Sequence, residues 1–316
     1  MNPEAKSLLS IVSPCYNEAD NIDELYQSIL KAVESEQKYA FEFIFIDNHS
    51  SDSTVAKLRA LARSDQRVKV ILNTRNFGHI RSPYYGILQS RGLATIYLAS
   101  DLQDPPEMIP QFIREWEAGY KLVMAVKPVS KTSVWMHAMR RTYYHLLDGI
   151  SDVSMLKDAT GFGLYDSAVL DDLRRIDDPY PYLRGLICEL GYEIKTIPFN
   201  QPRRMRGISK NNFYSLYDIA MLGIVSHSKI PIRIAAFTGL ALGTLSILLA
   251  FLFLIVKLIY WNQIPFGFAP IIIGMFFLFG VQFFFIGILG EYIASIHTYV
   301  QKRPTVVEQE RINFDK

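Results

Sequence analysis

Two long apolar segments near the C-terminus constrain the fold more than any other feature of the sequence. No charged residue occurs from Ile234 to Val256, and a second uncharged segment runs from Ile264 to Gly290. At 1.5 Å per residue, a helix of about 20 residues crosses the ~30 Å hydrocarbon core of a bilayer. Buried core helices of a soluble protein are seldom so long and so purely apolar. The sequence therefore predicts two transmembrane helices, joined as a hairpin, within residues 230–296.

The charges that flank the hairpin indicate its orientation. Lys229 and Arg233 precede the first apolar segment, and Lys302 and Arg303 follow the second, whereas the connecting turn Tyr260–Gln263 has neither Lys nor Arg. Cytoplasmic flanks of membrane helices carry the excess of positive charge. We therefore expect a protein of the inner (plasma) membrane with its N-terminal domain, both termini and the tail 297–316 in the cytoplasm.

The N-terminus and the cysteines agree with that compartment. The first twenty residues lack the charged and apolar regions of a signal peptide. Cys15 and Cys188 are the only cysteines, and they stand apart from each other and from histidine clusters. We expect neither a disulfide framework nor a zinc site, and a reducing environment fits.

Residues 211–229, just before the hairpin, carry an apolar stripe at helical spacing. This stripe predicts an amphipathic helix that lies in the membrane interface, or alternatively one that packs on the preceding domain. Its members are Phe213, Leu216, Tyr217, Ala220, Met221, Ile224 and Val225.

Residues 1–210 alternate short apolar runs with amphipathic stretches, which is typical of β-α units that form a mostly parallel sheet. Asp20 is a candidate N-cap for a first helix, and Asp52–Thr54 begins a second. We expect an α/β domain. Its predicted strands are Leu8–Ser13, Phe43–Ile46, Val68–Leu72, Thr95–Leu98 and Leu122–Val126.

Polar clusters follow three of these strands directly, at Pro14–Glu18, Asp47–Ser50 and Ser100–Asp104. Ligands of open α/β sheets bind at the carboxyl ends of the strands. Three polar clusters at one edge therefore predict a binding site. Asp101 and Gln103 offer oxygen ligands suited to Mg²⁺ or Mn²⁺, whereas Asp104 is either catalytic or simply the cap of a helix that begins at Pro105.

Four motifs, PCYNEADNI, IDNHSSDST, SDLQDPPEM and RGISK, resemble those of family 2 glycosyltransferases. The resemblance is strongest to the polyprenyl-phosphate sugar transferases, which include dolichyl-phosphate mannose synthases and bactoprenol glucosyltransferases of the GtrB type. It extends from about Leu8 to the C-terminus. It implies a GT-A type, Rossmann-like catalytic domain over residues 1–210.

The resemblance also implies roles for single residues on the donor side. It assigns Asp101 and Gln103 to the metal ion, with Asp101 catalytic. In the family the metal motif reads Asp-x-Asp, and its first acid falls at Ala99; the second acid of an Asp-Asp pair is likewise Asn48, which can still bond a base or ribose. The residues implied for the nucleotide sugar are Pro14, Tyr16, Asn17, Glu18, Asp47, Asn48 and Lys127.

Four positive charges, Arg203, Arg204, Arg206 and Lys210, lie just ahead of the predicted interfacial helix. They form a solvated face attracted to anionic lipid headgroups, or, as the family pattern Arg-x-x-Gly-x-Ser-Lys implies, they bind phosphates directly. The residues implied for the pyrophosphate and the acceptor phosphate are Arg140, Arg141, Arg204, Arg206, Ser209 and Lys210, of which Lys210 is also a catalytic candidate.

Family members often carry a Gly-Asp-Phe run that supplies a candidate general base. Here Gly161 stands where that acid would be, and only Asp158 is nearby in the sequence as a catalytic candidate. A phosphate monoester has its second pKa near 6, so it attacks without first losing a proton. The missing base therefore favours a phosphate acceptor over a sugar hydroxyl. His79 and Arg81 lie near the expected cleft, where we expect structural roles.

The expected activity is transfer of a hexose from a nucleotide diphosphate sugar to undecaprenyl phosphate with inversion, which makes a lipid-linked sugar for the cell envelope. Glucose from UDP-glucose is favoured, ahead of N-acetylhexosamine and mannose. The alternatives are a processive polysaccharide synthase, which lacks its Gln-x-x-Arg-Trp motif here, and a catalytically weakened membrane scaffold. A homo-oligomer packed through Gly239, Gly243 and Gly274 is an expected partner, and a nucleic acid is not.

Overall fold

The computed structural model describes residues 6–127, 156, 159–202, 230–260, 268–301 and 303–314. Its centre is an eight-stranded sheet in the order β7-β5-β6-β4-β1-β2-β3-β8. The strands are β1 (Ser7–Cys15), β2 (Tyr39–Asp47), β3 (Val68–Asn73), β4 (Ala94–Tyr97), β5 (Leu122–Val126), β6 (Ala159–Asp166), β7 (Ile194–Pro198) and β8 (Glu308–Ile312).

The predicted α/β class and mostly parallel sheet are confirmed. Strand β1 lies parallel to both β2 and β4, β2 is parallel to β3, and β5 is parallel to β7. Strand β6 runs antiparallel between β4 and β5, and β8 runs antiparallel along β3. All five predicted strands exist, whereas β6, β7 and β8 had not been predicted.

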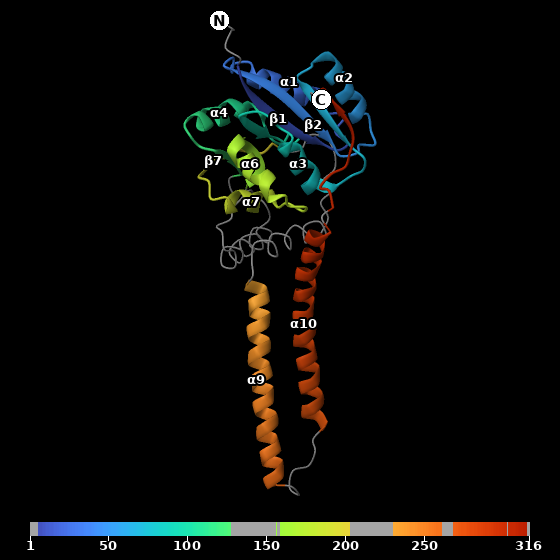
Figure 1. The fold of residues 1–316 in the computed structure, drawn as a ribbon, viewed down its shortest axis with the longest axis vertical. Coiled ribbons are helices and arrows are strands. Elements are labelled where there is room, and N and C mark those ends of the chain that lie inside the picture. Colours follow the sequence, from blue (N-terminus) through green and yellow to red (C-terminus); the bar gives the residue numbers. More distant parts are fainter. Residues whose placement is uncertain are drawn as a thin grey trace.

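Helices cover both faces of the sheet. One face carries α1 (Ile22–Val33), α2 (Thr54–Ser64) and α4 (Ile109–Glu117), which follows the short 3-10 helix η1 (Pro106–Met108). The other face carries α3 (Gly78–Leu88), α6 (Ser167–Ile176) and α7 (Leu183–Glu189), and this face is turned toward the two long helices of the molecule (Figure 1). Because both faces are covered, β2 reads as one apolar run rather than an alternating pattern.

Helix α1 begins differently from the prediction. Its N-cap is Asn21, not Asp20, and no side chain caps it. The N–H groups of Asn21 and Ile22 instead donate to the carbonyl oxygen of Glu18, at 2.9 and 3.1 Å. The loop after β1 therefore continues directly into the helix, which fixes the position of Glu18.

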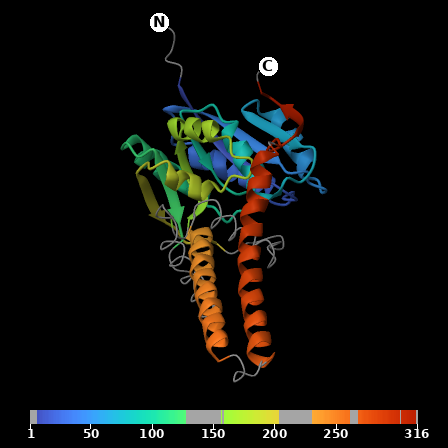
Figure 2. The same cartoon turned by 60° about the horizontal axis from the view of Figure 1, so that its bottom comes forward.

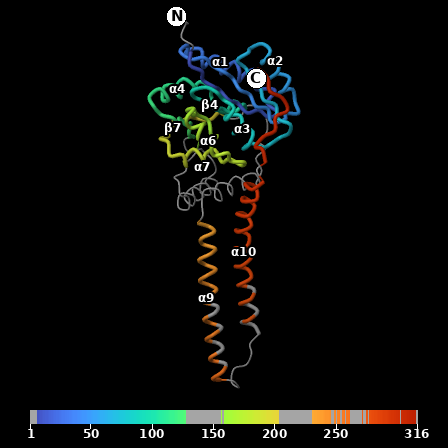
Figure 3. Tube along the Cα trace, in the orientation of Figure 1, coloured from blue at the N-terminus to red at the C-terminus, as the bar shows by residue number. Residues whose placement is uncertain are grey.

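Two long helices, α9 (Ile230–Ile259) and α10 (Phe268–Val300), leave the domain side by side (Figures 1 and 3). Their apolar side chains face outward: Phe237 is 70% exposed and Phe283 is 69% exposed. Among the described residues, Phe277–Val300 is long and apolar enough to cross a membrane, with a mean hydropathy of 1.8, and Ile230–Leu245 forms a shorter apolar helix. The predicted interfacial helix at 211–229 lies outside the described residues.

After α10 the chain returns to the domain that holds the sheet. Strand β8 adds to the edge of the sheet, where Val70 faces Ile312 and Ile71 faces Arg311. The side chain of Asn313 donates to the carbonyl oxygens of Ala62 and Val68, at 2.6 and 2.9 Å. The segment expected only as a tail thus covers an edge strand, and the turned view shows the C-terminus at the sheet end of the molecule (Figure 2).

Candidate active site

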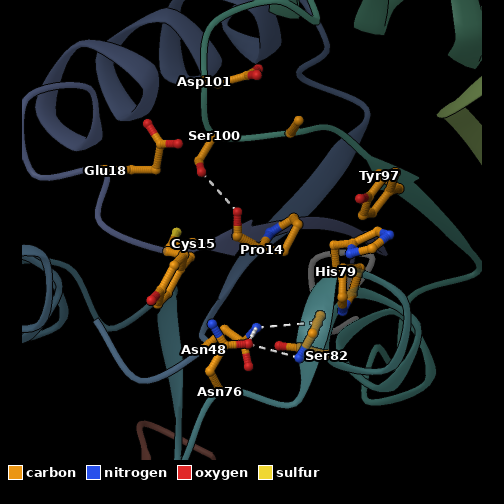
Figure 4. Close-up of a pocket in the computed structure, with 14 residues that line it drawn as sticks. Pro14, Cys15, Glu18, Asn48, Asn76, His79, Ser82, Tyr97, Ser100 and Asp101 are labelled. Carbon is orange, nitrogen blue, oxygen red and sulfur yellow. Dashed lines mark hydrogen bonds between the residues drawn. The ribbon is translucent and has the colours of Figure 1, made fainter. Parts of the chain in front are cut away.

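A pocket of about 340 Å³ opens at the carboxyl ends of β1, β2 and β4. The three polar clusters predicted to meet at this edge do meet there (Figure 4). The start of α3 forms a further wall that had not been predicted. The lining residues are Pro14, Cys15, Tyr16, Glu18, Asn48, Asn76, Gly78, His79, Ser82, Pro83, Tyr97, Ala99, Ser100 and Asp101.

The loops after β1 and β2 are bonded to each other. Asn17, at a positive φ of 56°, donates its backbone N–H to the Ser50 hydroxyl at 2.9 Å, and its side-chain oxygen accepts from the Ser51 N–H at 2.8 Å. The Glu18 N–H donates to the Thr54 hydroxyl at 2.9 Å. Asn17 does not line the pocket. It was assigned to the donor, but here it joins two loops.

Asp47 is also engaged within the protein. Its carboxylate is buried and accepts hydrogen bonds from the hydroxyl and the N–H of Ser50, the latter at 2.9 Å. Burial raises the pKa of Asp47, while the bonds from Ser50 oppose that shift. Asp47 is not among the lining residues, so its assignment to the nucleotide stays a prediction, and the observed contacts give it a structural role.

Asn48 is the centre of a network that builds the α3 wall. Its Nδ2 donates to Asn76 Oδ1 at 2.9 Å and to the Gly78 carbonyl at 3.1 Å, and its Oδ1 accepts from Asn73 Nδ2 at 3.2 Å and from the Phe77 N–H at 2.8 Å. These bonds occupy both donors and both lone pairs of the amide. The side-chain amide of Asn48 is thus fully engaged within the protein, and its expected bond to a base or ribose stays a prediction. An aspartate here would have no hydrogen to donate, which explains the departure from the family pattern.

Asp101 is the carboxylate that lines the pocket beyond β4. It sits in a tight turn, where Leu102 has a φ of 60° and Asp101 Oδ1 accepts from the Gln103 N–H at 3.2 Å. The Gln103 side chain donates to the Pro202 carbonyl at 3.3 Å. Within the described ranges no group of three His, Cys, Asp or Glu residues could hold a metal ion. One carboxylate with substrate phosphates and water is nevertheless a common donor set for Mg²⁺, so Asp101 fits such an ion.

Asp104 is neither a helix cap nor a lining residue. Pro105 is the N-cap of η1 and no side chain caps that helix. Asp104 is 4% exposed, and its Oδ2 accepts from the Ala99 N–H at 2.9 Å. Burial raises its pKa to about 6. The side chain therefore holds the Asp101 turn from behind, and the capping interpretation is wrong.

His79, Asn76, Ser82 and Tyr97 are pocket residues that the sequence analysis did not assign to the site. A signal was present, because Arg75–His79 directly follows a predicted strand, as the three assigned clusters do. Partial desolvation lowers the pKa of His79.

The remaining predicted site residues divide into two groups. Lys127 follows β5 at the edge of the described region, half-buried, and does not line the pocket. The others lie outside the described residues and stay predictions: Arg140, Arg141, Asp158, Arg204, Arg206, Ser209 and Lys210.

Comparison with known proteins identifies the class of enzyme. The family model "Glycosyl transferase family 2" matches residues 10–173, the segment that builds β1 to β6 and the pocket. The protein is a glycosyltransferase. The chain belongs to glycosyl transferase family 2, as its motifs indicated.

Relatives match over nearly the whole chain. An uncharacterised glycosyltransferase, YkcC of Bacillus subtilis, is 32% identical over 97% of this chain and 94% of its own. The bactoprenol glucosyl transferase of Shigella phage SfII is 32% identical over 95% of this chain and 96% of its own. Among solved structures, the mannosyltransferase PcManGT of Pyrobaculum calidifontis, in complex with GDP-Man and Mn²⁺, is 16% identical over 95% of this chain and 88% of its own, with a TM-score of 0.45.

Proposed function

We propose that this enzyme transfers a hexose, glucose first, from UDP-glucose to a polyprenyl phosphate such as undecaprenyl phosphate, with inversion at the anomeric carbon. The product is a lipid-linked sugar for cell-envelope glycosylation. The observation that carries the proposal is the attachment of the pocket-bearing sheet to α9 and α10, because it keeps the active site beside the lipid phase. The name of the phage relative supports the same acceptor.

The return of the chain into the sheet supports a two-span topology. Helix α9 has 30 residues and α10 has 33, so each exceeds the length of about 20 residues that a span requires. Because β8 pairs with β3, the chain re-enters the domain from which it left. If the helices lie in a bilayer, the number of crossings is therefore even. The positive flanks then place the domain in the cytoplasm.

On the donor side, the pocket of about 340 Å³ receives the nucleotide between the β1 and α3 walls. Tyr16 and Glu18 would contact the nucleoside, while Asp101 would hold Mg²⁺ or Mn²⁺ together with the diphosphate, with Gln103 beside it. When bound there, such an ion would neutralise charge on the departing diphosphate. The hydrogen bonds of Asn48 and Asp104 keep both walls in place before the donor binds.

On the acceptor side, the lipid phosphate attacks the anomeric carbon as a dianion, so no residue has to remove a proton. The task left to the protein is positioning and neutralisation of charge. We assign that task to Lys127 and to the basic residues Arg140, Arg141, Arg204, Arg206 and Lys210, with Ser209 as a hydrogen-bond donor and Asp158 as a further catalytic candidate.

The proposal is tested with purified full-length protein in mixed micelles. It is incubated with polyprenyl phosphate and, in separate reactions, with labelled UDP-glucose, UDP-N-acetylglucosamine and GDP-mannose, each with Mg²⁺, with Mn²⁺ and with EDTA. We expect label in the lipid phase from UDP-glucose, and none when polyprenol replaces polyprenyl phosphate. Equal transfer to polyprenol would contradict the phosphate acceptor, and transfer only from another donor would correct the sugar.

A further inference from the structure

A second pocket, of about 180 Å³, adjoins the first and is not used by the function proposed above. The two pockets share His79, Pro83 and Tyr97 as lining residues. The opposite wall of the second pocket comes from Thr160 at the start of β6 and from the segment that leads into α7. Figure 1 shows α7 on the side of the domain that faces α9 and α10. The second pocket therefore lies between the donor pocket and the membrane helices.

The lining of the second pocket is cationic and apolar. Arg184 carries a permanent positive charge, and Ile80, Tyr182 and Leu183 supply apolar surface, while none of the described residues that line the pocket is Asp or Glu. A site for a sugar needs acceptors for several hydroxyl groups, and carboxylates are the strongest of them. A cation beside aliphatic and aromatic side chains instead suits an anion attached to a hydrocarbon.

Arg184 has the geometry to bind such an anion. Its NH1 donates to the Ala159 carbonyl at 3.1 Å, and its guanidinium lies 5.4 Å from the centre of the Tyr182 ring. These two contacts orient the planar group. A guanidinium has five N–H donors, and the bond to Ala159 uses one of them.

A hydrogen bond connects the wall of this pocket to a membrane helix. The Tyr299 hydroxyl, at the C-terminal end of α10, donates to Asp178 Oδ2 at 3.0 Å, and the other oxygen of Asp178 accepts from the Tyr180 N–H at 2.8 Å. The segment from Asp178 leads directly to Tyr182 and Leu183. The end of α10 and the second pocket are thus held close together.

We propose that the second pocket binds the phosphate and the first prenyl unit of the lipid acceptor, with Arg184 as the phosphate ligand. This assignment rests on the function proposed above and adds a binding residue to it. A phosphate oxygen in this pocket would lie next to the donor pocket, where His79, Pro83 and Tyr97 line both pockets. It forms the new bond to the anomeric carbon as the bond from that carbon to the diphosphate breaks, and the diphosphate leaves with the electron pair. No proton has to move.

The test measures steady-state kinetics of the full-length enzyme against each substrate separately. For Arg184→Gln we expect the KM for polyprenyl phosphate to rise about 10-fold to 100-fold, the range for a lost charge-assisted bond, while the KM for UDP-glucose changes less than about 2-fold. Arg184→Lys keeps the charge without the planar fork and should recover part of the loss. The matched control is Arg175→Gln, because Arg175 is 80% exposed and pairs with Asp172; it should leave both KM values unchanged.

A structural role of Arg184 predicts a different result. If its bond to Ala159 only supports the fold, Arg184→Gln will lower the melting temperature and kcat, and both KM values will stay the same or rise together; that outcome overturns the assignment. A soluble short-chain prenyl phosphate should compete with the lipid acceptor far better than inorganic phosphate does. Equal inhibition by the two would overturn the part of the proposal that concerns the prenyl unit.

Failure of the proposed function would look different again. In that case the wild-type enzyme would transfer no sugar to any lipid phosphate. If the wild-type enzyme does make the lipid-linked sugar and only the KM shift of Arg184→Gln is missing, the function stands and the pocket assignment alone is wrong.

Discussion

The two sides of the donor pocket use their polar residues differently. On the β1 and β2 side, the side chains of Asn17, Asp47 and Asn48 form hydrogen bonds with other groups of the protein. On the β4 side, Asp101 stands in the pocket lining in a short turn that buried Asp104 supports from behind. The first side is therefore held together by bonds between protein groups, and the second has the Asp101 carboxylate in the pocket lining. In the function proposed here, the polar residues of the first side support the pocket and Asp101 takes part in the reaction.

The largest effect should come from Asp101→Asn. The change keeps the shape of the side chain but removes the charge that, in the proposed function, would hold the metal ion and the diphosphate. We expect kcat to fall about 100-fold to 1000-fold, in the range seen when one electrostatic contact to a transition state is lost. The free energy of unfolding should change by less than about 0.5 kcal/mol, since Asp101 is only half-buried. A large loss of stability with a normal kcat would contradict this role and show that Asp101 supports the fold instead.

Asn48→Asp should do the opposite. The new carboxylate cannot donate to Asn76 or Gly78, and it adds charge at a buried position. We expect the free energy of unfolding to drop by about 2–3 kcal/mol, measured by urea denaturation of the full-length protein in detergent. Activity should fall less than in Asp101→Asn at a temperature where the variant is folded. If the free energy of unfolding does not change, the hydrogen-bond network does not explain why asparagine rather than aspartate stands at position 48.

Asp104 should make the free energy of unfolding depend on pH. Because its pKa is raised from 3.8 to about 6 in the folded protein, the folded state binds its proton more tightly than the unfolded state. Its contribution is thus most favourable below pH 4 and is lost as pH rises through about 6, by about 3 kcal/mol in total.

Asp104→Asn should remove this dependence, because the amide still accepts from the Ala99 N–H without titrating. The measurement is the difference in unfolding free energy between wild type and variant from pH 4 to pH 7. A difference that does not change with pH would refute the role of burial.

The smallest effect should come from Asn17→Gly. Glycine tolerates the positive φ at this position, so the change removes only the two bonds that Asn17 Oδ1 accepts from the N–H and the hydroxyl of Ser51. We expect a loss of about 1 kcal/mol in stability and nearly normal KM for UDP-glucose. A rise in that KM of about tenfold would show that Asn17 contributes to donor binding after all.

The sequence predicted the parallel centre of the sheet because strand-length apolar runs and helix faces are local signals. It could not predict β8, whose sequence Glu308–Ile312 is mostly polar and becomes a strand only by pairing with β3, more than two hundred positions away. Because ligands of open α/β sheets bind at the carboxyl ends of the strands, Asp101 was expected at this edge, and it does line the pocket; its role in catalysis stays a prediction.

The same rule placed Asn17 and Asp47 at the right edge without indicating which way their side chains turn. The role of Asn48 depends on partners from Asn73 to Gly78, a loop whose shape no periodicity encodes. Asp104 looked like a helix cap because a proline pair follows it, but its carboxylate turns back to the Ala99 N–H.

The central claim is transfer of sugar to a lipid phosphate, and its most direct test is the label recovered in the lipid phase after one incubation. Wild-type enzyme, Asp101→Asn and Asn48→Asp are each reconstituted in vesicles with polyprenyl phosphate and given labelled UDP-glucose and Mg²⁺. We predict a labelled lipid phosphate sugar from wild type, almost none from Asp101→Asn, and an intermediate yield from Asn48→Asp. Label that stays in the aqueous phase with wild type, or an equal lipid yield from Asp101→Asn, would contradict the account.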